Sequence, residues 1–115
     1  MKFENLRVWQ KSLELTVKIH DLTKSFPKEE LFILTSQIKR AMDSVALNIA
    51  EGSTGNTNAE FRRFLTYSIR SGIEVIACLH IAKARDIIQD EHFNMLYNET
   101  NDLVKSIQAL KNSIK

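Results

Sequence analysis

The sequence has very few of the residues that end helices and strands, with one proline and three glycines among 115 residues. Long elements joined by few turns are therefore expected. A single cysteine, Cys78, excludes an internal disulfide and a zinc site built on several cysteines. No apolar run approaches the roughly 20 residues that span a bilayer, and the first ten residues lack the apolar core of a signal peptide. We therefore expect a cytoplasmic protein with no membrane partner.

The composition is that of an ordinary globular protein, with 43% apolar and 26% charged residues. The length suits one domain, residues 1–115, with one core. The formal net charge of +2 is too small to name a polyanionic partner. The charge is unevenly distributed, because residues 37–85 carry seven Lys/Arg against four Asp/Glu. The middle of the chain is therefore its basic part.

The most informative stretch is 37–52, QIKRAMDSVALNIAEG. Its apolar residues recur at helical spacing, which predicts one buried helix face: Ile38, Met42, Val45 and Ile49. A second row lies roughly 120° round the same helix: Gln37, Ala41, Ser44, Asn48 and Glu51. Gly52, followed by a polar loop, is predicted to end the helix as a C-cap.

The periodicity predicts four helices, at about residues 5–24, 27–51, 58–87 and 90–112. Asn5 and Asp90 are expected N-caps, and Thr57 with Glu60 has the form of a capping box. Gly72 lies on the apolar face of the third helix, which indicates a close approach of a neighbouring helix. With short connections and no strand pattern, the expected fold is all-α, an antiparallel up-down-up-down four-helix bundle.

The residues of common catalytic and metal sites are not in the required patterns. A di-metal bundle needs Glu-x-x-His motifs, but none of His20, His80 and His92 has a glutamate three residues before it. Cys78 lies in an apolar helical setting, which predicts a buried, inert thiol. Ser44 and Ser71 lack a glycine-flanked nucleophile elbow. We therefore expect no catalytic, metal or cofactor site, and no enzyme.

A polar set on the second and third helices has two interpretations: Ser44, Asn48, Glu51, Ser71 and Glu74. It is either a ligand-binding or catalytic cluster, or a hydrogen-bond network that fixes the register of the helical hairpin. The structural interpretation is favoured, because each such group left buried and unpaired costs about 1–3 kcal/mol. Glu51 and Glu74 are expected to pair with Arg70 or Arg40, or to cap the loop after Gly52.

Two surface predictions concern the same helices. The candidates for contacts with nucleic-acid phosphates are Lys39, Arg40, Arg62, Arg63 and Arg70, although from the sequence alone an ordinary solvated surface is the favoured explanation of these residues. The two helices also carry more apolar circumference than a lone bundle buries, with Ile33, Leu47 and Ile73 lying off the buried face. These three residues are predicted to form an interface between copies of the chain.

The order of motifs resembles a bacterial family, the proteins encoded in intervening sequences of 23S ribosomal RNA genes. The resemblance covers about residues 3–112 and rests on stretches such as Phe26-Pro27, QIKRA at 37–41, S-x-x-x-N-I-A-E-G at 44–52 and Glu60-Phe61. One position departs, since Arg70 precedes Ser71 where the family tends to have glycine.

The resemblance implies a four-helix bundle that forms a homopentameric ring with a central channel and a basic surface for nucleic acid. The family includes the accessory protein of diversity-generating retroelements, whose partner is a reverse transcriptase. The leading hypothesis is a non-enzymatic, oligomeric accessory protein that binds RNA or DNA weakly. The alternative is an assembly or adaptor protein that binds a protein partner such as a reverse transcriptase.

Overall fold

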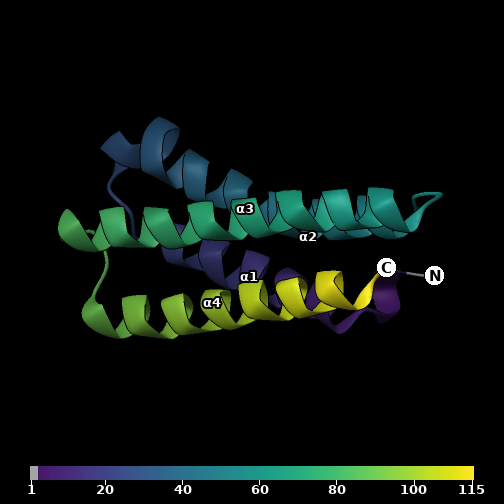
Figure 1. Cartoon of the computed structure of the whole chain (residues 1–115). Helices are drawn as coiled ribbons and strands as arrows, with labels where there is room; N and C mark the ends of the chain where they lie inside the picture. Colours follow the sequence, from purple (N-terminus) through teal and green to yellow (C-terminus); the bar gives the residue numbers. More distant parts are fainter. Residues whose placement is uncertain (1–2) are drawn as a thin grey trace.

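The computed structural model describes residues 3–115, which form four long α-helices. They are α1 (Arg7–Thr23), α2 (Ser36–Ser53), α3 (Asn58–Ala84) and α4 (Asp90–Ser113). Consecutive helices run antiparallel, and α1 also packs on α4, which closes the bundle (Figure 1). The predicted all-α, up-down-up-down four-helix bundle is confirmed.

The core consists of the apolar positions that the helical period predicts. The four seam residues of α2, Ile38, Met42, Val45 and Ile49, are fully buried. They pack with the matching row of α3, in which Leu65, Val75 and Leu79 are fully buried and Ser68 and Gly72 are also inside. The outer side of α4 is polar, as expected for a helix with one buried face.

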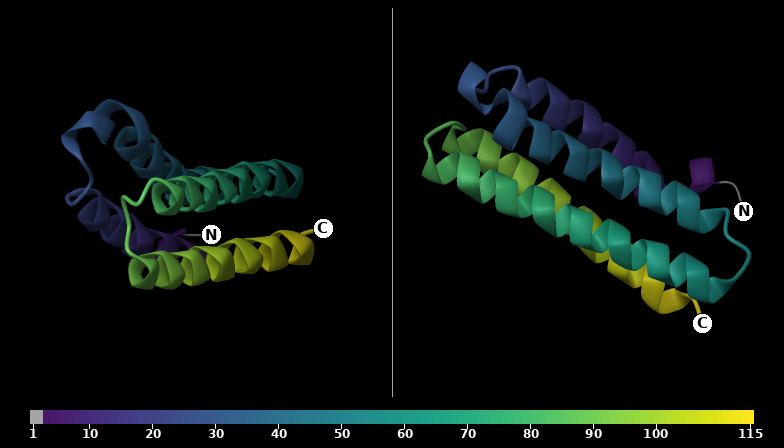
Figure 2. Two further views of the ribbon diagram at one scale, coloured as in Figure 1. Left: turned by 90° about the vertical axis from the view of Figure 1, so that its left-hand side faces the viewer. Right: turned by 90° about the horizontal axis from the view of Figure 1, so that it is seen from above.

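The predicted second helix is wrong over its first two turns. Instead of an α-helix from Pro27, the chain forms a 3₁₀ turn, Lys28–Glu30, then a π-helical turn, Leu31–Thr35, before α2 begins at Ser36. A π turn accommodates one extra residue, so Leu31 rotates off the apolar seam and lies half in solvent. The segment diverges from α3 at the end of the bundle (Figures 1 and 2).

Helix ends differ from prediction by a few residues. Asn5 belongs to a 3₁₀ turn, Phe3–Asn5, and Leu6 precedes α1 as its N-cap. The third helix stops at Ala84 because Asp86 takes a left-handed conformation, with φ of 57°. Gln89, rather than Asp90, is the N-cap of α4. The Thr57 cap is confirmed, since its hydroxyl accepts a hydrogen bond from Glu60 N at 3.1 Å.

Two glycines lie at close contacts between helices. At Gly72, a Cβ would lie 2.6 Å from Val104 Cγ2, which confirms the predicted close approach, here to α4. Gly52 does not end α2 as predicted, since the helix continues to Ser53 and no glycine of residues 3–115 has a positive φ. A Cβ there would lie 2.6 Å from Phe64 Cβ, so Gly52 is where α2 and α3 pack most tightly.

One helix, α3, is long and apolar enough to cross a membrane by length and composition alone. A core helix of a soluble bundle meets the same criterion, and α3 supplies a large share of the buried residues. The cytoplasmic location therefore remains a prediction.

Candidate functional site

The pairing of α2 with α3 is set by hydrogen bonds as well as by apolar contacts. Ser68 is fully buried on α3, and its hydroxyl donates to the carbonyl oxygen of Val45 on α2 at 2.8 Å. Because this acceptor is already used within α2, the bond is possible only where the helices approach closely. The bond fixes the axial position of α3 relative to α2.

The predicted polar set is partly brought together. Ser71 Oγ donates to Ser44 Oγ at 2.9 Å, across the two helices. Asn48 Nδ2 donates to the same Ser44 Oγ and to Ser44 O, both at 2.9 Å. These three half-buried residues form one continuous network that bridges α2 and α3.

The two carboxylates are separate from that network. Glu74 Oε2 accepts a hydrogen bond from Gln37 Nε2 at 3.0 Å. The Glu51 side chain is exposed and forms no hydrogen bond among residues 3–115. Neither carboxylate forms an ion pair with Arg40 or Arg70 in this part of the chain, contrary to prediction.

An open groove of about 590 Å³ lies between α2, its preceding turn and α3. Phe32 and Ile33 give it an apolar end, whereas Arg40 and Glu74 give it charges of both signs. The serines of the network, Ser44 and Ser71, lie along it as well. The groove therefore combines apolar area with hydrogen-bonding groups, as protein-binding surfaces do.

We use the term α2/α3 face for the exposed residues of α2, of its preceding turn and of α3. Large apolar side chains on this face lie in solvent. The three predicted interface residues are open, Ile33 at 59% exposure, Leu47 at 66% and Ile73 at 54%. Phe32, at 89%, is the most exposed of all and was not predicted as a site residue. The run of four apolar residues at 31–34, directly after the Pro27 turn, was the signal, because no helix buries four consecutive side chains on one face.

The five predicted basic residues do not form one surface. Arg40, Arg63 and Arg70 are exposed on α2 and α3, and the Arg63 guanidinium lies 5.5 Å from the centre of the Phe64 ring. Lys39 lines a different cavity, between α1 and the turn before α2.

Arg62 has a structural role that the sequence did not predict. Its Nη1 donates to the carbonyl oxygens of Lys111 and Ile114, the latter at 2.9 Å, and so caps the end of α4. A helix leaves its last carbonyls without partners, and this guanidinium satisfies two of them. Both bonds use Nη1, so they hold the Arg62 side chain against the end of α4.

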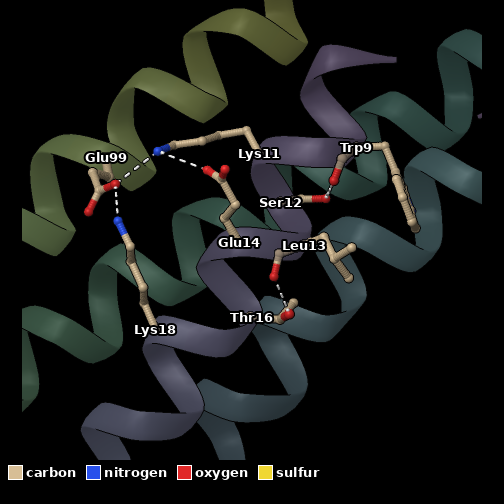
Figure 3. Close-up of polar contacts among 8 residues, drawn as sticks. All are labelled: Trp9, Lys11, Ser12, Leu13, Glu14, Thr16, Lys18 and Glu99. Carbon is tan, nitrogen blue, oxygen red and sulfur yellow. Dashed lines mark hydrogen bonds and ion pairs between the residues drawn. The ribbon is translucent and has the colours of Figure 1, made fainter. Parts of the chain in front are cut away.

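A charged cluster joins α1 and α4 on the side of the bundle formed by these two helices. Lys11 and Lys18 donate to the same oxygen of Glu99, Oε1, at 2.8 and 2.7 Å (Figure 3). The hydrogen bond to Glu99 raises the pKa of Lys11. Burial alone would raise the pKa of Glu99, but the bonds from the two lysines outweigh it and lower the pKa. The cluster stabilises the α1/α4 contact.

Cys78 is a buried free thiol. Burial raises the pKa of Cys78 to about 11, with a further contribution from the charge of Glu74, so the thiol stays protonated at neutral pH. Within residues 3–115, no three His, Cys, Asp or Glu side chains are grouped as metal ligands.

The family model described as 23S rRNA-intervening sequence protein matches residues 4–109. The chain belongs to this family. A crystal structure of a protein of unknown function from the S23 ribosomal protein family of Bacteroides thetaiotaomicron superposes with a TM-score of 0.86. The two sequences are 26% identical, and the match covers 97% of this chain and 99% of that one. No curated protein matches the chain.

Proposed function

We propose that this 23S rRNA-intervening sequence protein is a non-enzymatic, cytoplasmic bundle that self-associates through its α2/α3 face and offers arginines to RNA or DNA. The observation that carries the proposal is the exposure of Phe32, Ile33, Leu47 and Ile73 on that face. Burying a side chain of this size stabilises a complex by about 1.5–3 kcal/mol before the cost of association.

A second apolar patch supports a ring rather than a two-fold dimer. Leu13 and Val17 are exposed on α1 and, four residues apart, share one helix face. A ring needs a heterologous interface, in which one patch of a subunit meets a different patch of the next. The face around Phe32 and the patch on α1 supply two such surfaces, in keeping with the homopentamer that the family resemblance implies.

The nucleic-acid part of the proposal rests on Arg40, Arg63 and Arg70. None of the three forms an ion pair among residues 3–115, so no carboxylate has to be displaced when a phosphate binds. Three cations per subunit give weak binding, but several subunits in one assembly bind a single strand together and gain in avidity. Binding should fall steeply with salt, because each phosphate contact releases counterions.

The test is a filter-binding titration with a structured RNA and a duplex DNA at two salt concentrations. We expect binding at low salt that weakens at high salt, and a reduced salt slope in Arg63→Gln/Arg70→Gln. The matched control is Lys105→Gln/Lys115→Gln, which removes two exposed cations at and beyond α4 and should bind like wild type. Equal binding by both double variants would contradict the assignment of these arginines.

The adaptor alternative is favoured by a different observation, the mixed apolar and charged lining of the α2/α3 groove. In that case the assembly binds a protein partner and its arginines only solvate the surface. Absence of any RNA or DNA binding at low salt, by a protein that still self-associates, would favour the adaptor.

A further inference from the structure

The corner where α1 passes into α2 is shaped by the residues of the connection. Phe26 is buried against the core, and Pro27 fixes the backbone before the 3₁₀ and π turns begin. The chain therefore turns widely at this end of the bundle (Figure 2). It leaves a cavity of about 350 Å³ between the end of α1, the connection and the start of α2.

The ionisable residues that line this cavity are all basic. They are His20 from α1, Lys24 directly after α1, Lys28 from the 3₁₀ turn and Lys39 from α2, and no acidic residue is among the lining residues. The connection between α1 and α2 therefore brings the positive charges of three lysines to one place. The α2/α3 groove differs, because Glu74 lies there with Arg40.

Acidic neighbours pair with one of the three lysines and with the histidine. Lys24 Nζ lies 3.2 Å from Asp21 Oδ1, and His20 Nε2 lies 3.3 Å from Asp43 Oδ1. In the adjoining turn, Glu29 is exposed and Glu30 pairs with Arg85 at 3.3 Å. Lys28 and Lys39 form no ion pair within residues 3–115. Their charges remain available to a bound anion.

A buried hydroxyl group adds a second, independent observation. Thr35 lines the cavity and is only 5% exposed, yet its Oγ1 has no hydrogen-bond partner in the described part of the chain. A buried hydroxyl without a partner costs about 1–3 kcal/mol. Its neighbour Thr23 differs, because its hydroxyl donates to His20 O at 2.8 Å.

We propose that this cavity, lined by Lys24, Lys28, Lys39 and Thr35, binds a phosphate group. Several ammonium groups favour a multiply charged anion over a carboxylate, and a phosphate ester carries about −1.5 to −2 at neutral pH. Lysine binds phosphate as a point charge without bidentate geometry. Phe26, Pro27 and Leu31 give the cavity apolar walls. The phosphate comes either from a free small molecule or from a nucleic acid.

The proposal goes beyond the function proposed above and does not depend on it. The cavity lies within one subunit, whereas the arginines of the first proposal lie on the exposed surface of α2 and α3. Phosphate should therefore bind even if the protein is monomeric and Arg63 and Arg70 contact no nucleic acid.

The test is a titration of the full-length chain with inorganic phosphate, followed by amide chemical shifts, with sodium chloride of equal ionic strength as reference. We expect saturable shifts at Thr23 and Thr35. In Lys28→Gln/Lys39→Gln the affinity should fall by about tenfold or more, whereas Lys28→Arg/Lys39→Arg should keep it. Lys105→Gln/Lys115→Gln is the matched control and should bind like wild type.

A short oligonucleotide with and without a 5′-phosphate distinguishes the two sources. Stronger shifts at Thr23 and Thr35 with the phosphorylated form identify a nucleic-acid end as the source, and equal saturable shifts with both forms identify the phosphodiester backbone. Shifts with inorganic phosphate but with neither oligonucleotide identify a free phosphate compound. The proposal is overturned if inorganic phosphate causes no saturable shift, or if the Lys28→Gln/Lys39→Gln protein, folded by its spectrum, binds phosphate as wild type does.

Discussion

The α1/α4 side and the α2/α3 side of the bundle use their outward-facing residues differently. Across α1 and α4, Lys11 and Lys18 bind one carboxylate, Glu99, and Met95 is the one large apolar residue of α4 that is strongly exposed. On the other side, Phe32, Leu47 and Ile73 lie in solvent. The α1/α4 side is joined by this ion-pair cluster and exposes the small apolar patch of Leu13 and Val17, whereas the α2/α3 side exposes more large apolar side chains, which a partner can cover.

The α2/α3 hairpin is closely packed in its interior. Gly52 of α2 lies against Phe64 of α3, and Gly72 of α3 lies against Val104 of α4. The open face therefore does not result from loose packing between α2 and α3. Substitutions in the internal packing should lower the free energy of unfolding strongly, whereas substitutions on the outer surface should change it little.

The largest effect is expected for Gly52→Ala. The new methyl group would lie 2.6 Å from Phe64 Cβ, an atom that no side-chain rotation can move. The two helices must separate, and we expect a loss of about 2–3 kcal/mol in the free energy of unfolding, measured in urea. Gly72→Ala contacts a side-chain methyl instead, so Val104→Ala should relieve its effect. An unchanged urea midpoint in Gly52→Ala would contradict the close contact.

A smaller loss is expected for Ser68→Ala, which removes the buried hydrogen bond to Val45 O. The acceptor keeps its bond within α2, so we expect about 1 kcal/mol in the free energy of unfolding. Asn48→Ala, which removes the bonds to Ser44, should cost a similar amount. If Asn48→Ala left both the melting temperature and the oligomer size unchanged, the structural interpretation of the polar network would be wrong.

The charged cluster of the α1/α4 side predicts a dependence on pH. The pKa of Glu99 is lowered and that of Lys11 is raised in the folded protein. Their stabilisation is therefore present between about pH 4 and pH 10, and is lost as the pH falls through the lowered pKa of Glu99 or rises through the raised pKa of Lys11.

Glu99→Gln tests this dependence directly. At neutral pH the variant should lose about 0.5–1 kcal/mol, because both lysines are partly exposed and solvent screens the pairs. The difference from wild type should shrink as the pH is lowered below 4. A difference that stays constant down to pH 2 would assign the effect to packing rather than to charge.

The smallest effect concerns Cys78. With a pKa of about 11, on the order of one thiol in a thousand is ionised at pH 8. A thiol reagent should therefore react with the native protein far more slowly than with the protein in denaturant. Rapid modification of the native protein would show that the contact around Glu74 and Cys78 opens readily.

The sequence predicted the parts of this molecule that depend on local periodicity. The buried row of α2 from Ile38 to Ile49 follows directly from helical spacing, and the Ser44–Asn48 pair follows from the four-residue separation. The π turn at Leu31–Thr35 was not predictable in the same way, because a run of four apolar residues has no period that distinguishes a π turn from an α-helix.

The sequence pattern could not predict contacts between residues that are distant in the chain. Arg62 caps the end of α4 through Ile114, 52 residues away, so the sequence alone could not separate it from the exposed Arg63. The expected pairing of Glu74 with an arginine was wrong for the same reason, since Gln37 occupies its oxygen. The basic cavity of Lys28 and Lys39 was not predicted for a different reason, since the unpredicted 3₁₀ and π turns shape the connection that forms it.

Sedimentation velocity over a range of protein concentrations tests most directly that the α2/α3 face is an interface between copies. We predict that wild type sediments as an oligomer at micromolar concentration, that Phe32→Glu/Ile73→Glu sediments as a folded 13.2 kDa monomer, and that Met95→Glu on the other side remains oligomeric. A wild-type protein that stays monomeric throughout, or a Phe32→Glu/Ile73→Glu protein that assembles as wild type does, would contradict the account.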